Sequence, residues 1–291
     1  MELVFVYGTL RQGERYHTLM GDSRLLYALA QVKGTLQDTG LGYPVLLERE
    51  GRVAGELYEV TEEILQKLDE LEGYVGPGQA GNEYERVLME VVTDRGTVMA
   101  WVYVYRLSQQ YLSIPEGDWK LYRLKQEEEL YYFAYGSCMD LERIELAGAG
   151  KWFDNVAGCA VLEGFSVEFT LQAADGGRAD LVEGEGRTEG KLYRIVPECL
   201  YSYLFKREGV EDGVYRPAVL FVQCEDGVHR EAVTFVVVNK ESALAPPEHY
   251  MREILRGAEP VVSPEYYAAL EKRFVEVFGY TQHVSGPKRS F

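Results

Sequence analysis

One short stretch occurs twice in this chain and constrains the fold more than any other feature. The run Val4-Phe5-Val6-Tyr7-Gly8-Thr9-Leu10-Arg11 has a counterpart in Tyr131-Tyr132-Phe133-Ala134-Tyr135-Gly136-Ser137-Cys138-Met139. Each copy is rich in β-branched and aromatic residues, and each stops at Tyr-Gly followed by Thr or Ser. This pattern predicts a buried strand that the glycine ends. Successive backbone N–H groups at such a turn form a concave nest that can bind an anion or a carbonyl oxygen.

Further pairs of segments follow in the same order and indicate a duplication. Gly55-Glu56-Leu57-Tyr58 has its counterpart in Gly190-Lys191-Leu192-Tyr193, and Glu72-Gly73 has its counterpart in Glu208-Gly209. The offsets between the copies are 128 positions at the first glycine, 135 at Tyr58 and 136 at Glu72. Such a small drift is what loop insertions produce, so the chain is expected to contain two domains of one kind.

Hydrophobic periodicity and capping signals predict the elements of each half. The ambiguous segment of the first half is Leu19 to Ala30, which could be a turn or a short helix. In the first half we expect strands at 53–60, 86–93 and 97–105, and a helix that Thr61 caps and Gly73 ends. In the second half we expect strands at 216–223 and 231–238, and helices from Pro197, at 247–256 and at 264–278.

The pattern lapses between the two halves, which suggests a join. Residues 114–119 read as an irregular segment, and Glu127-Glu128-Glu129 is a run of charge typical of a linker or a solvated helix face. We therefore predict a first domain at 1–108, a linker at 109–129 and a second domain at 130–279. The last residues, 280–291, are expected to form a mobile tail.

The charge balance narrows the classes of partner. The formal net charge of the 291-residue chain is −17, which argues against nucleic acid and against an anionic membrane surface, since both are bound by an excess of Lys and Arg. No basic segment followed by a long apolar run occurs at the N-terminus, so no signal peptide is expected and a cytoplasmic location follows. The simplest interpretation of the charge is a solvated acidic surface that keeps the protein soluble.

Cysteine and histidine usage offers no metal site. The four cysteines lie in the second half without Cys-x-x-Cys spacing, and the four histidines are scattered singly. We expect the cysteines to be reduced and mostly buried, with no metal or cofactor.

Both halves resemble γ-glutamylcyclotransferases of the AIG2-like superfamily. The first half is more similar to the compact branch, which includes γ-glutamylamine cyclotransferases, and the second to the branch that acts on γ-glutamyl amino acids. The residues that carry the resemblance in the first half are Val6 to Arg11, Gly55 to Tyr58, Leu68 to Gly73 and Tyr84 to Val87. In the second half they are Phe133 to Ser137, Gly190 to Tyr193, Glu208 to Val210 with Tyr215, Pro247 to Met251, and Gly257 with Ala258.

The resemblance implies both a fold and a reaction. The fold class is α+β: two tandem γ-glutamylcyclotransferase-like domains, each a small mixed β-barrel, closed or nearly closed, with flanking helices. The reaction converts a γ-glutamyl amide into 5-oxoproline and a free amine, when the substrate's α-amino nitrogen attacks its own γ-carbonyl. The essential side chain is the Glu before the Gly, so the resemblance identifies Glu72 and Glu208 as catalytic.

The chemistry of ring closure agrees with one carboxyl group per site. The attack is intramolecular, so the protein needs to hold the substrate folded and to supply a general base. A free Glu has a pKa near ~4.3 and would be a weak base at neutral pH, but burial and the end of a helix raise it. An ordinary solvated Glu before a capping Gly is the alternative for either residue alone, and the recurrence in two copies favours the catalytic interpretation.

The two glycine turns and a few tyrosines complete the expected sites. The turns could bind the α-carboxylate or the developing oxyanion through backbone N–H groups, although a simple strand-ending turn is the alternative. Cys138 departs from the Asn of the resembled branch, and a Cys nucleophile would lack an activating His. Tyr84 and Tyr215 could donate to substrate or be core tyrosines, and only the second half has Tyr250. The expected substrate-binding residues are Tyr7, Gly8, Thr9, Leu10, Tyr84, Tyr135, Gly136, Ser137, Cys138, Tyr215 and Tyr250.

Two other functions fit the same residues. The chain could be a non-catalytic sensor of γ-glutamyl or related small carboxylate metabolites. It could also be an acyltransferase that cleaves the amide of a γ-glutamyl-protected product. The sequence does not choose the leaving amine.

Overall fold

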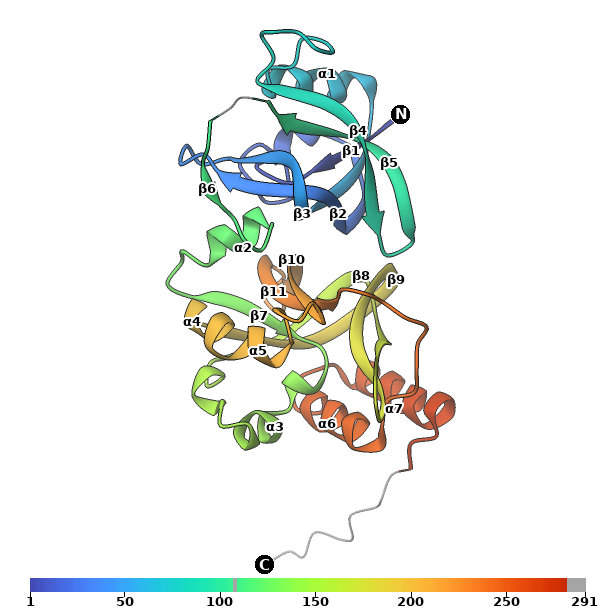
Figure 1. Ribbon diagram of the computed structural model, residues 1–291. Coiled ribbons are helices and arrows are strands. Elements are labelled where there is room, and N and C mark those ends of the chain that lie inside the picture. Colours follow the sequence, from blue (N-terminus) through green and yellow to red (C-terminus); the bar gives the residue numbers. More distant parts are fainter. Residues whose placement is uncertain (107–108, 282–291) are drawn as a thin grey trace, which may run out of the picture. The chain divides into compact units, whose positions relative to one another are not determined.

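The computed structural model describes residues 1–106 and 109–281, which divide into two compact units (Figure 1). The chain passes from the first unit to the second between Glu127 and Glu128. Each unit combines a mixed β-sheet with flanking helices, as the expected α+β class requires.

The first unit is built on a ring of five strands. The strand order is β3-β1-β5-β4-β2, and an additional pairing of β2 with β3 joins the two ends of that order. The strand β1 runs antiparallel to β3 and parallel to β5. The elements of this unit are β1 (Glu2–Val6), η1 (His17–Met20), β2 (Arg24–Asp38), β3 (Pro44–Val60), α1 (Glu62–Leu71), β4 (Tyr84–Thr93), β5 (Gly96–Tyr105), β6 (Leu112–Ser113) and α2 (Trp119–Leu124).

The second unit is a closed barrel with the strand order β10-β11-β7-β9-β8. If its strands are matched to β1–β5 in chain order, the sequence of neighbours around the ring is the same, and β7 again runs parallel to the last strand. The elements are β7 (Leu130–Ala134), η2 (Ser137–Met139), α3 (Leu141–Leu146), η3 (Gly150–Trp152), β8 (Val156–Ala173), β9 (Gly176–Ile195), α4 (Pro197–Cys199), η4 (Leu200–Leu204), α5 (Phe205–Arg207), β10 (Tyr215–Cys224), β11 (His229–Val237), α6 (Glu248–Ala258) and α7 (Pro264–Phe278).

The first strand of the chain is buried on both faces because it lies between two cores. Phe5 and Tyr7 belong to a cluster that receives residues from all five strands of the first ring, and therefore fills its interior. Val4 and Val6 point the other way, into a cluster that contains Leu65 of α1. A strand with successive side chains on opposite faces needs a continuous apolar run to satisfy two cores, which explains the sequence of β1.

Two glycines mark where another strand crosses the end of the buried strand. A Cβ at Gly55 of β3 would lie 2.4 Å from the carbonyl oxygen of Val6, and one at Gly190 of β9 would lie 2.4 Å from that of Ala134. No side chain fits at such a distance, so the first residue of each Gly-x-Leu-Tyr segment is fixed by backbone contact.

The segment expected to be a linker, 109–129, folds largely as part of the first unit, which corrects that prediction. Strand β6 pairs with the end of β2, and Ile114 donates its N–H to the carbonyl of Leu36 at 2.9 Å. Asp118 caps α2 and also pairs with buried Arg11, with Oδ1 at 2.7 Å from Nη1. A buried guanidinium needs such a partner, but no local pattern in this segment indicates that it supplies one.

Two other expectations change. The segment Leu19 to Ala30 is mainly the start of β2 rather than a turn or helix, and bulges in its pairing with β3 break the alternation that identifies a strand. Tyr280, the first residue of the expected tail, is buried and donates its N–H to the carbonyl of Phe274. Residues 282–291 of that tail lie outside the described part of the chain.

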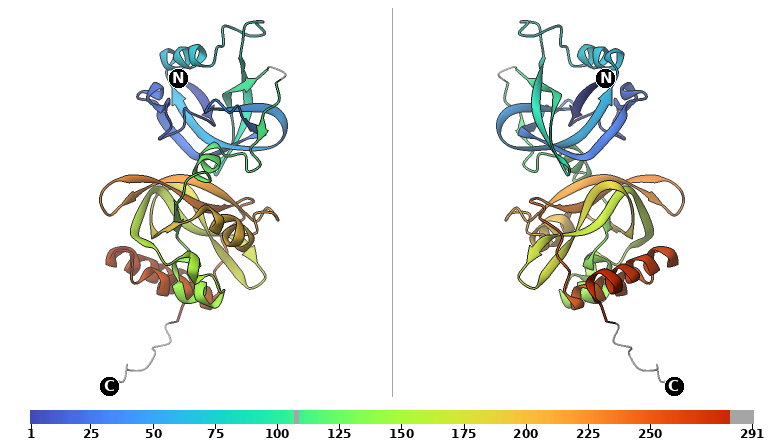
Figure 2. Two further views of the ribbon diagram at one scale, coloured as in Figure 1. Left: turned by 90° about the vertical axis from the view of Figure 1, so that its left-hand side faces the viewer. Right: turned by 90° about the vertical axis from the view of Figure 1, so that its right-hand side faces the viewer.

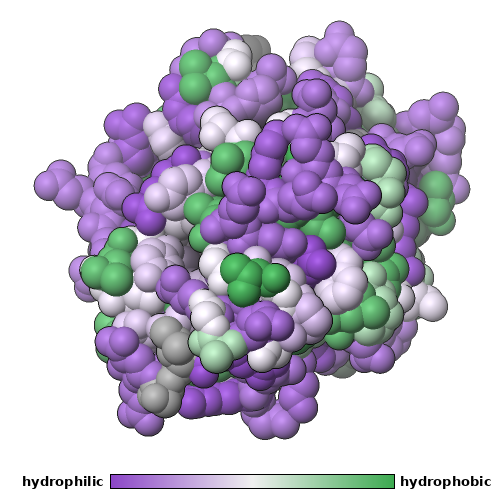
Figure 3. Space-filling model, turned by 90° about the horizontal axis from the view of Figure 1, so that it is seen from above, coloured by the Kyte–Doolittle hydropathy of each residue, from purple (hydrophilic) through white to green (hydrophobic). Residues whose placement is uncertain are grey.

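The C-terminal helices distinguish the second unit from the first. Figures 1 and 2 show α6 and α7 beside one another at the second barrel. Ser263 caps α7 and Gly279 ends it in the left-handed conformation, as expected from the sequence. The face of the molecule in Figure 3 is mostly hydrophilic, with hydrophobic side chains in small groups. Within the described residues, no helix has the length and apolar character needed to cross a membrane.

Candidate active sites

The first unit contains a cavity of about 210 Å³ at the end of β1. The turn after β1, the end of α1 and the start of β4 all contribute to its wall. All six site residues predicted in this half line it: Tyr7, Gly8, Thr9, Leu10, Glu72 and Tyr84. The fold therefore brings together segments separated by more than sixty residues.

Glu72 reaches this cavity because α1 ends there. It is the residue that follows the last turn, and Gly73 adopts a φ of 61°, a conformation that glycine adopts without strain. The N–H of Tyr74 then bonds to the carbonyl of Asp69 at 2.9 Å and closes the helix end. The predicted helix end at Gly73 is confirmed, and it places Glu72 in the wall of the cavity.

The environment of Glu72 favours its neutral form. Burial is the main cause, and the nearby carboxylate of Glu83 adds to it, so that the pKa of Glu72 is raised to about 8. No ion pair joins Glu72 to another of the described residues. A carboxyl group with such a pKa can both take and return a proton near neutral pH.

A buried charged cluster supports the turn of the first site. The carboxylate of Glu56 accepts from the N–H of Gln12 at 2.7 Å and from the hydroxyl of Tyr58 at 2.8 Å. The same carboxylate pairs with Arg11 at 3.3 Å and with Lys120 at 3.1 Å. These contacts fix the turn through Arg11 and Gln12. The N–H groups of Thr9 and Leu10 form no backbone hydrogen bond with other described residues.

The tyrosines of the first site face the cavity with their hydroxyls already engaged. Tyr7 donates to the carbonyl of Tyr103 at 2.8 Å, and Tyr84 donates to that of Pro44 at 3.4 Å. Burial raises the pKa of both hydroxyls, so they are neutral donors rather than bases. The long Tyr84 hydrogen bond leaves that hydroxyl the easier of the two to redirect toward a ligand.

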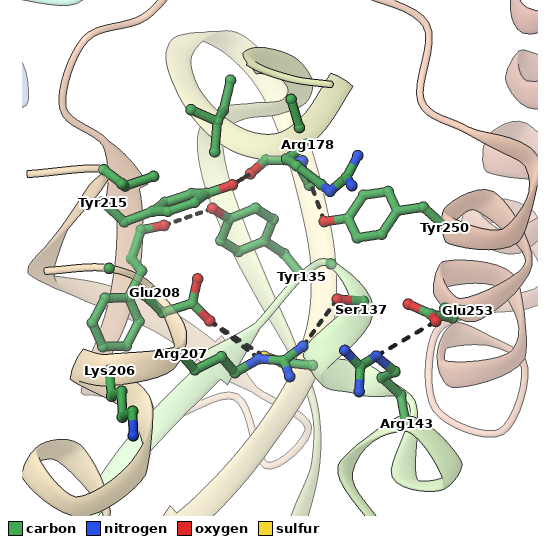
Figure 4. A pocket seen from close by; sticks show the side chains of 18 of the residues that line it. Tyr135, Ser137, Arg143, Arg178, Lys206, Arg207, Glu208, Tyr215, Tyr250 and Glu253 are labelled. Atoms are coloured by element: carbon green, nitrogen blue, oxygen red, sulfur yellow. Dashed lines mark hydrogen bonds and ion pairs between the residues drawn. The ribbon is translucent and has the colours of Figure 1, made fainter. Parts of the chain in front are cut away.

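The second unit has a larger cavity, about 760 Å³, at the corresponding end of β7 (Figure 4). All seven site residues predicted in this half line it: Tyr135, Gly136, Ser137, Cys138, Glu208, Tyr215 and Tyr250. As in the first half, the Glu follows the end of a helix and precedes a glycine, here Gly209, with a φ of 60°.

Glu208 differs from Glu72 in having a cation beside it. Burial raises the pKa of Glu208, and the guanidinium of Arg207 opposes that rise, with Nε at 3.5 Å from Oε1. Arg207 also donates to the Cys138 sulfur at 3.1 Å and to the Ser137 hydroxyl at 3.2 Å. This arginine thus links the carboxylate of the second site to its turn.

Cys138 lies between these two groups. Its sulfur is 3.6 Å from Oε1 of Glu208, to which the thiol donates. Burial raises the pKa of the thiol, although Arg207 acts in the opposite direction. A protonated thiol is a poor nucleophile, so the geometry favours Glu208 over Cys138 as the reactive group.

The second turn is supported by a cation instead of a carboxylate. Lys191 donates from Nζ to the carbonyl of Met139 at 3.0 Å, and the hydroxyl of Tyr193 donates to that of Cys138 at 3.1 Å. Ser137 and Cys138 open the short helix η2, where the first N–H groups have no partner within the helix. Within the part of the chain that the structure describes, both turns therefore present N–H groups without a backbone acceptor.

Three tyrosines form one wall of the second cavity. Tyr135 donates to the carbonyl of Phe235 at 2.6 Å, and Tyr215 donates to that of Ala179 at 2.8 Å. The hydroxyl of Tyr250, from α6, accepts from the N–H of Ala179 at 3.3 Å. Figure 4 shows these three rings along the side of the cavity away from Lys206, Arg207 and Arg143.

Sequence reasoning missed the charged residues that surround the predicted ones. The additional charged residues in the two linings are Arg15 and Glu83 in the first cavity, and Arg143, Arg178, Lys206, Arg207, His249 and Glu253 in the second. Arg207 could have been found by aligning the two halves, since it immediately precedes Glu208. Among the described residues, no three His, Cys, Asp or Glu side chains are grouped as metal ligands would be.

Family models match both halves of the chain. One, described as gamma-glutamyl cyclotransferase, AIG2-like, matches residues 4–121. Another, the AIG2-like family, matches residues 187–270. The first match continues past residue 108 and reaches the first residues of α2.

Individual relatives agree with the family models. The chain is 41% identical to the YkqA protein of Bacillus subtilis strain 168 over 276 residues, which cover 93% of this chain and 96% of the relative. It is 48% identical over 125 residues to the γ-L-glutamyl-butirosin B γ-glutamyl cyclotransferase of Niallia circulans, covering 43% of this chain and 80% of that enzyme. The crystal structure of YkqA superposes with a TM-score of 0.84, covering 94% of this chain and 98% of that one.

Proposed function

The chain belongs to the AIG2-like γ-glutamyl cyclotransferase family, and from this we propose that it releases 5-oxoproline and a free amine from a γ-glutamyl amide or γ-glutamyl amino acid. Each unit would carry one site, with Glu72 and Glu208 as the acid–base groups. No metal or cofactor takes part in this proposal.

The observation that carries the proposal is the position of Glu72. It is the carboxyl group at the end of α1, it faces a cavity beside the glycine turn, and burial raises its pKa to about 8. A surface Glu before a helix-capping glycine would keep its usual pKa, and it would have no reason to face free N–H donors. The same arrangement around Glu208 supports the proposal for the second unit.

During ring closure the carboxyl group takes up one proton from the substrate and later gives it back. The carboxylate takes a proton from the substrate's α-ammonium group, and the freed nitrogen attacks the γ-carbonyl carbon. A bond forms between nitrogen and carbon while the carbonyl oxygen becomes an oxyanion, which the N–H groups of the turn can stabilise. The carboxylic acid then returns its proton to the departing amine nitrogen as the old amide bond breaks, and the ring nitrogen, which still carries two protons, releases one of them to water.

The turn and the tyrosines would hold the γ-glutamyl part of the substrate in the folded conformation that the attack requires. In the first site the N–H groups of Thr9 and Leu10 are the donors, with Tyr84 as an additional hydroxyl. In the second site Ser137 and Cys138 supply the N–H groups, with Tyr215 and Tyr250 nearby. The Cys138 side chain is not needed for backbone recognition.

The test is release of 5-oxoproline from a panel of γ-glutamyl amino acids, glutathione and γ-glutamyl amines. The wild-type protein would be compared with Glu72→Gln, Glu208→Gln and the double variant, each checked for folding by circular dichroism. We expect release by the wild type and none above background by the double variant. Full release by the folded double variant would refute the acid–base assignment. No release by any protein, with 5-oxoproline still bound, would instead favour the sensor function.

A further inference from the structure

The linings of the two cavities differ in charge. The second cavity has four cationic side chains, Arg143, Arg178, Lys206 and Arg207, and two carboxylates, those of Glu208 and Glu253. The first cavity has one cationic side chain and two carboxylates: Arg15, Glu72 and Glu83. An excess of cations in one cavity is unexpected in a chain whose net charge is −17, so it calls for an anionic ligand.

The contrast is sharpest immediately before the proposed catalytic residues. Lys206 and Arg207 precede Glu208, whereas the equivalent positions of the first unit hold Glu70 and Leu71. Both segments lie at the end of a helix with the same glycine stop. The helix ends in the same way in the two units, although the π-helix η4 precedes α5, so the charge difference at these positions comes from the side chains.

Three of the cations lie along one edge of the cavity (Figure 4). Lys206 is exposed and forms no ion pair with another described residue, and Arg143 keeps 40% of its side chain exposed beside Glu253 at 3.5 Å. Arg207 already donates to Cys138, Ser137 and Tyr203, and 16% of its side chain remains exposed. Arg178 is different, because Asp175 pairs with it at 2.6 Å.

The second cavity is large enough to hold a leaving group beside this cationic edge. Its volume, about 760 Å³, is more than three times that of the first cavity, about 210 Å³. The tyrosine wall and the turn account for the γ-glutamyl end of a substrate, so the cationic edge is left for the amine that departs.

We infer that the second site takes γ-glutamyl compounds whose leaving amine is an acidic amino acid, with γ-glutamyl-glutamate as the simplest member of the class. This inference rests on the proposed function of the same site. Arg207 and Lys206 would meet the side-chain carboxylate of the leaving amino acid, and Arg143 its α-carboxylate. The first site lacks such an edge and would not share this preference.

The test compares γ-glutamyl-glutamate with γ-glutamyl-glutamine, which has nearly the same shape and lacks the side-chain charge. Release of 5-oxoproline is measured in the Glu72→Gln protein, so that turnover reports the second site alone. We expect kcat/KM to be higher for γ-glutamyl-glutamate by roughly threefold to tenfold, mainly through KM, and to fall toward equality as ionic strength rises. Equal kcat/KM values for the two substrates would overturn the inference and leave the proposed function standing.

Variants that change these charges test the assignment to residues. In the same background, Lys206→Glu should remove the preference while release from γ-glutamyl-glutamine continues. Arg143→Gln removes a partner of the α-carboxylate, which both substrates carry, so it should raise KM for both and keep the preference. The matched control is Lys272→Glu, which makes the same charge change as Lys206→Glu on an exposed face of α7, and it should keep the preference. A preference that survives Lys206→Glu would overturn the inference.

The inference can be tested separately from catalysis. If no substrate is turned over, binding of the same two compounds to the Glu208→Gln protein is measured by calorimetry. Tighter binding of γ-glutamyl-glutamate, lost in a second protein that also carries Lys206→Glu, would support the inference although the proposed function had failed. Equal binding of the two compounds, or binding of neither, would overturn it.

Discussion

The two units share one order of strands but support their glycine turns with groups of opposite charge. In the first, the carboxylate of Glu56 accepts from the N–H of Gln12 and pairs with Arg11. In the second, Lys191 stands at the position of Glu56 and donates to the carbonyl of Met139. A carboxylate binds the donors of a turn and an ammonium group binds its acceptors, so either can fix the same backbone. The shape of the turn is thus retained while the chemistry that holds it is exchanged.

The same contrast extends to the carboxyl groups that we propose as catalytic. Leu71 precedes Glu72, and the carboxyl group of Glu72 has only burial and a second carboxylate to set its pKa. Arg207 precedes Glu208 and opposes the effect of burial. One position in each helix therefore tunes the proton affinity of its neighbour.

The largest expected effect is on turnover. With the second site silenced by Glu208→Gln, adding Glu72→Gln should lower the remaining 5-oxoproline release by about 10²–10⁴-fold, because a positioned acid–base group contributes about that much. The control is Glu70→Gln, which changes an exposed carboxylate two residues away and should leave release within about twofold. If Glu70→Gln and Glu72→Gln lowered release equally, Glu72 would not be the acid–base group.

The next effect is on the free energy of unfolding. Met139 is the residue of the second unit that is equivalent to Arg11. The Arg11→Met change would therefore leave Glu56 and Asp118 without their buried partner. We expect a loss of about 3–5 kcal/mol in denaturant unfolding of the first unit. Arg24→Met removes an exposed partner of Glu59 and should cost about 1 kcal/mol or less. A small effect of Arg11→Met would mean that Lys120 alone balances the cluster.

A smaller loss of stability is expected where strands cross. Gly55→Ala would place a methyl group 2.4 Å from the carbonyl of Val6, so the backbone has to shift, at about 1–3 kcal/mol. Gly81→Ala has open space around its Cβ and should change stability by less than about 0.5 kcal/mol. Calorimetric melting of the two variants would make the comparison, and equal melting temperatures would show that the crossing relaxes freely.

The smallest expected effect is a shift in pH dependence. A general base acts when deprotonated, so kcat/KM rises with pH through the pKa of the free enzyme's base, which for Glu72 is about 8. Arg207→Leu gives the second unit the residue of the first and removes the cation that lowers the Glu208 pKa. In the Glu72→Gln background we expect the rise in kcat/KM to move to higher pH, because the carboxylate loses the cation that stabilises its charged form. A shift to lower pH would contradict the assignment of Glu208 as the base.

Much of the candidate site could be predicted because its residues lie in short segments with recognisable local patterns. The strand that ends at Tyr-Gly and the helix that ends at Glu-Gly are local patterns, and their repetition showed that they belong together. The cationic edge was missed because Arg143 and Lys206 come from helices whose sequences look like ordinary solvated surface. Asp118 was missed for a related reason. It lies in an irregular segment, and no local pattern there indicates that it pairs with Arg11, more than a hundred residues away.

The long strands of the fold could be predicted only in part. The long strands β2, β3, β8 and β9 bend through bulges, where the register of pairing shifts. At each bulge the alternation of apolar and polar residues is interrupted, so the sequence signal ends before the strand does. Of β3, only its second half was therefore predicted.

The closed rings also bear on how a chain with two related halves avoids misfolding. Similar sequences fused in one polypeptide risk exchanging strands during folding, because an unpaired strand edge accepts any compatible partner. In each unit the five ring strands all have neighbours on both sides. Once a ring has closed, it presents no open edge to the other copy, so closure itself limits strand exchange between the halves and protects newly made chains from aggregation.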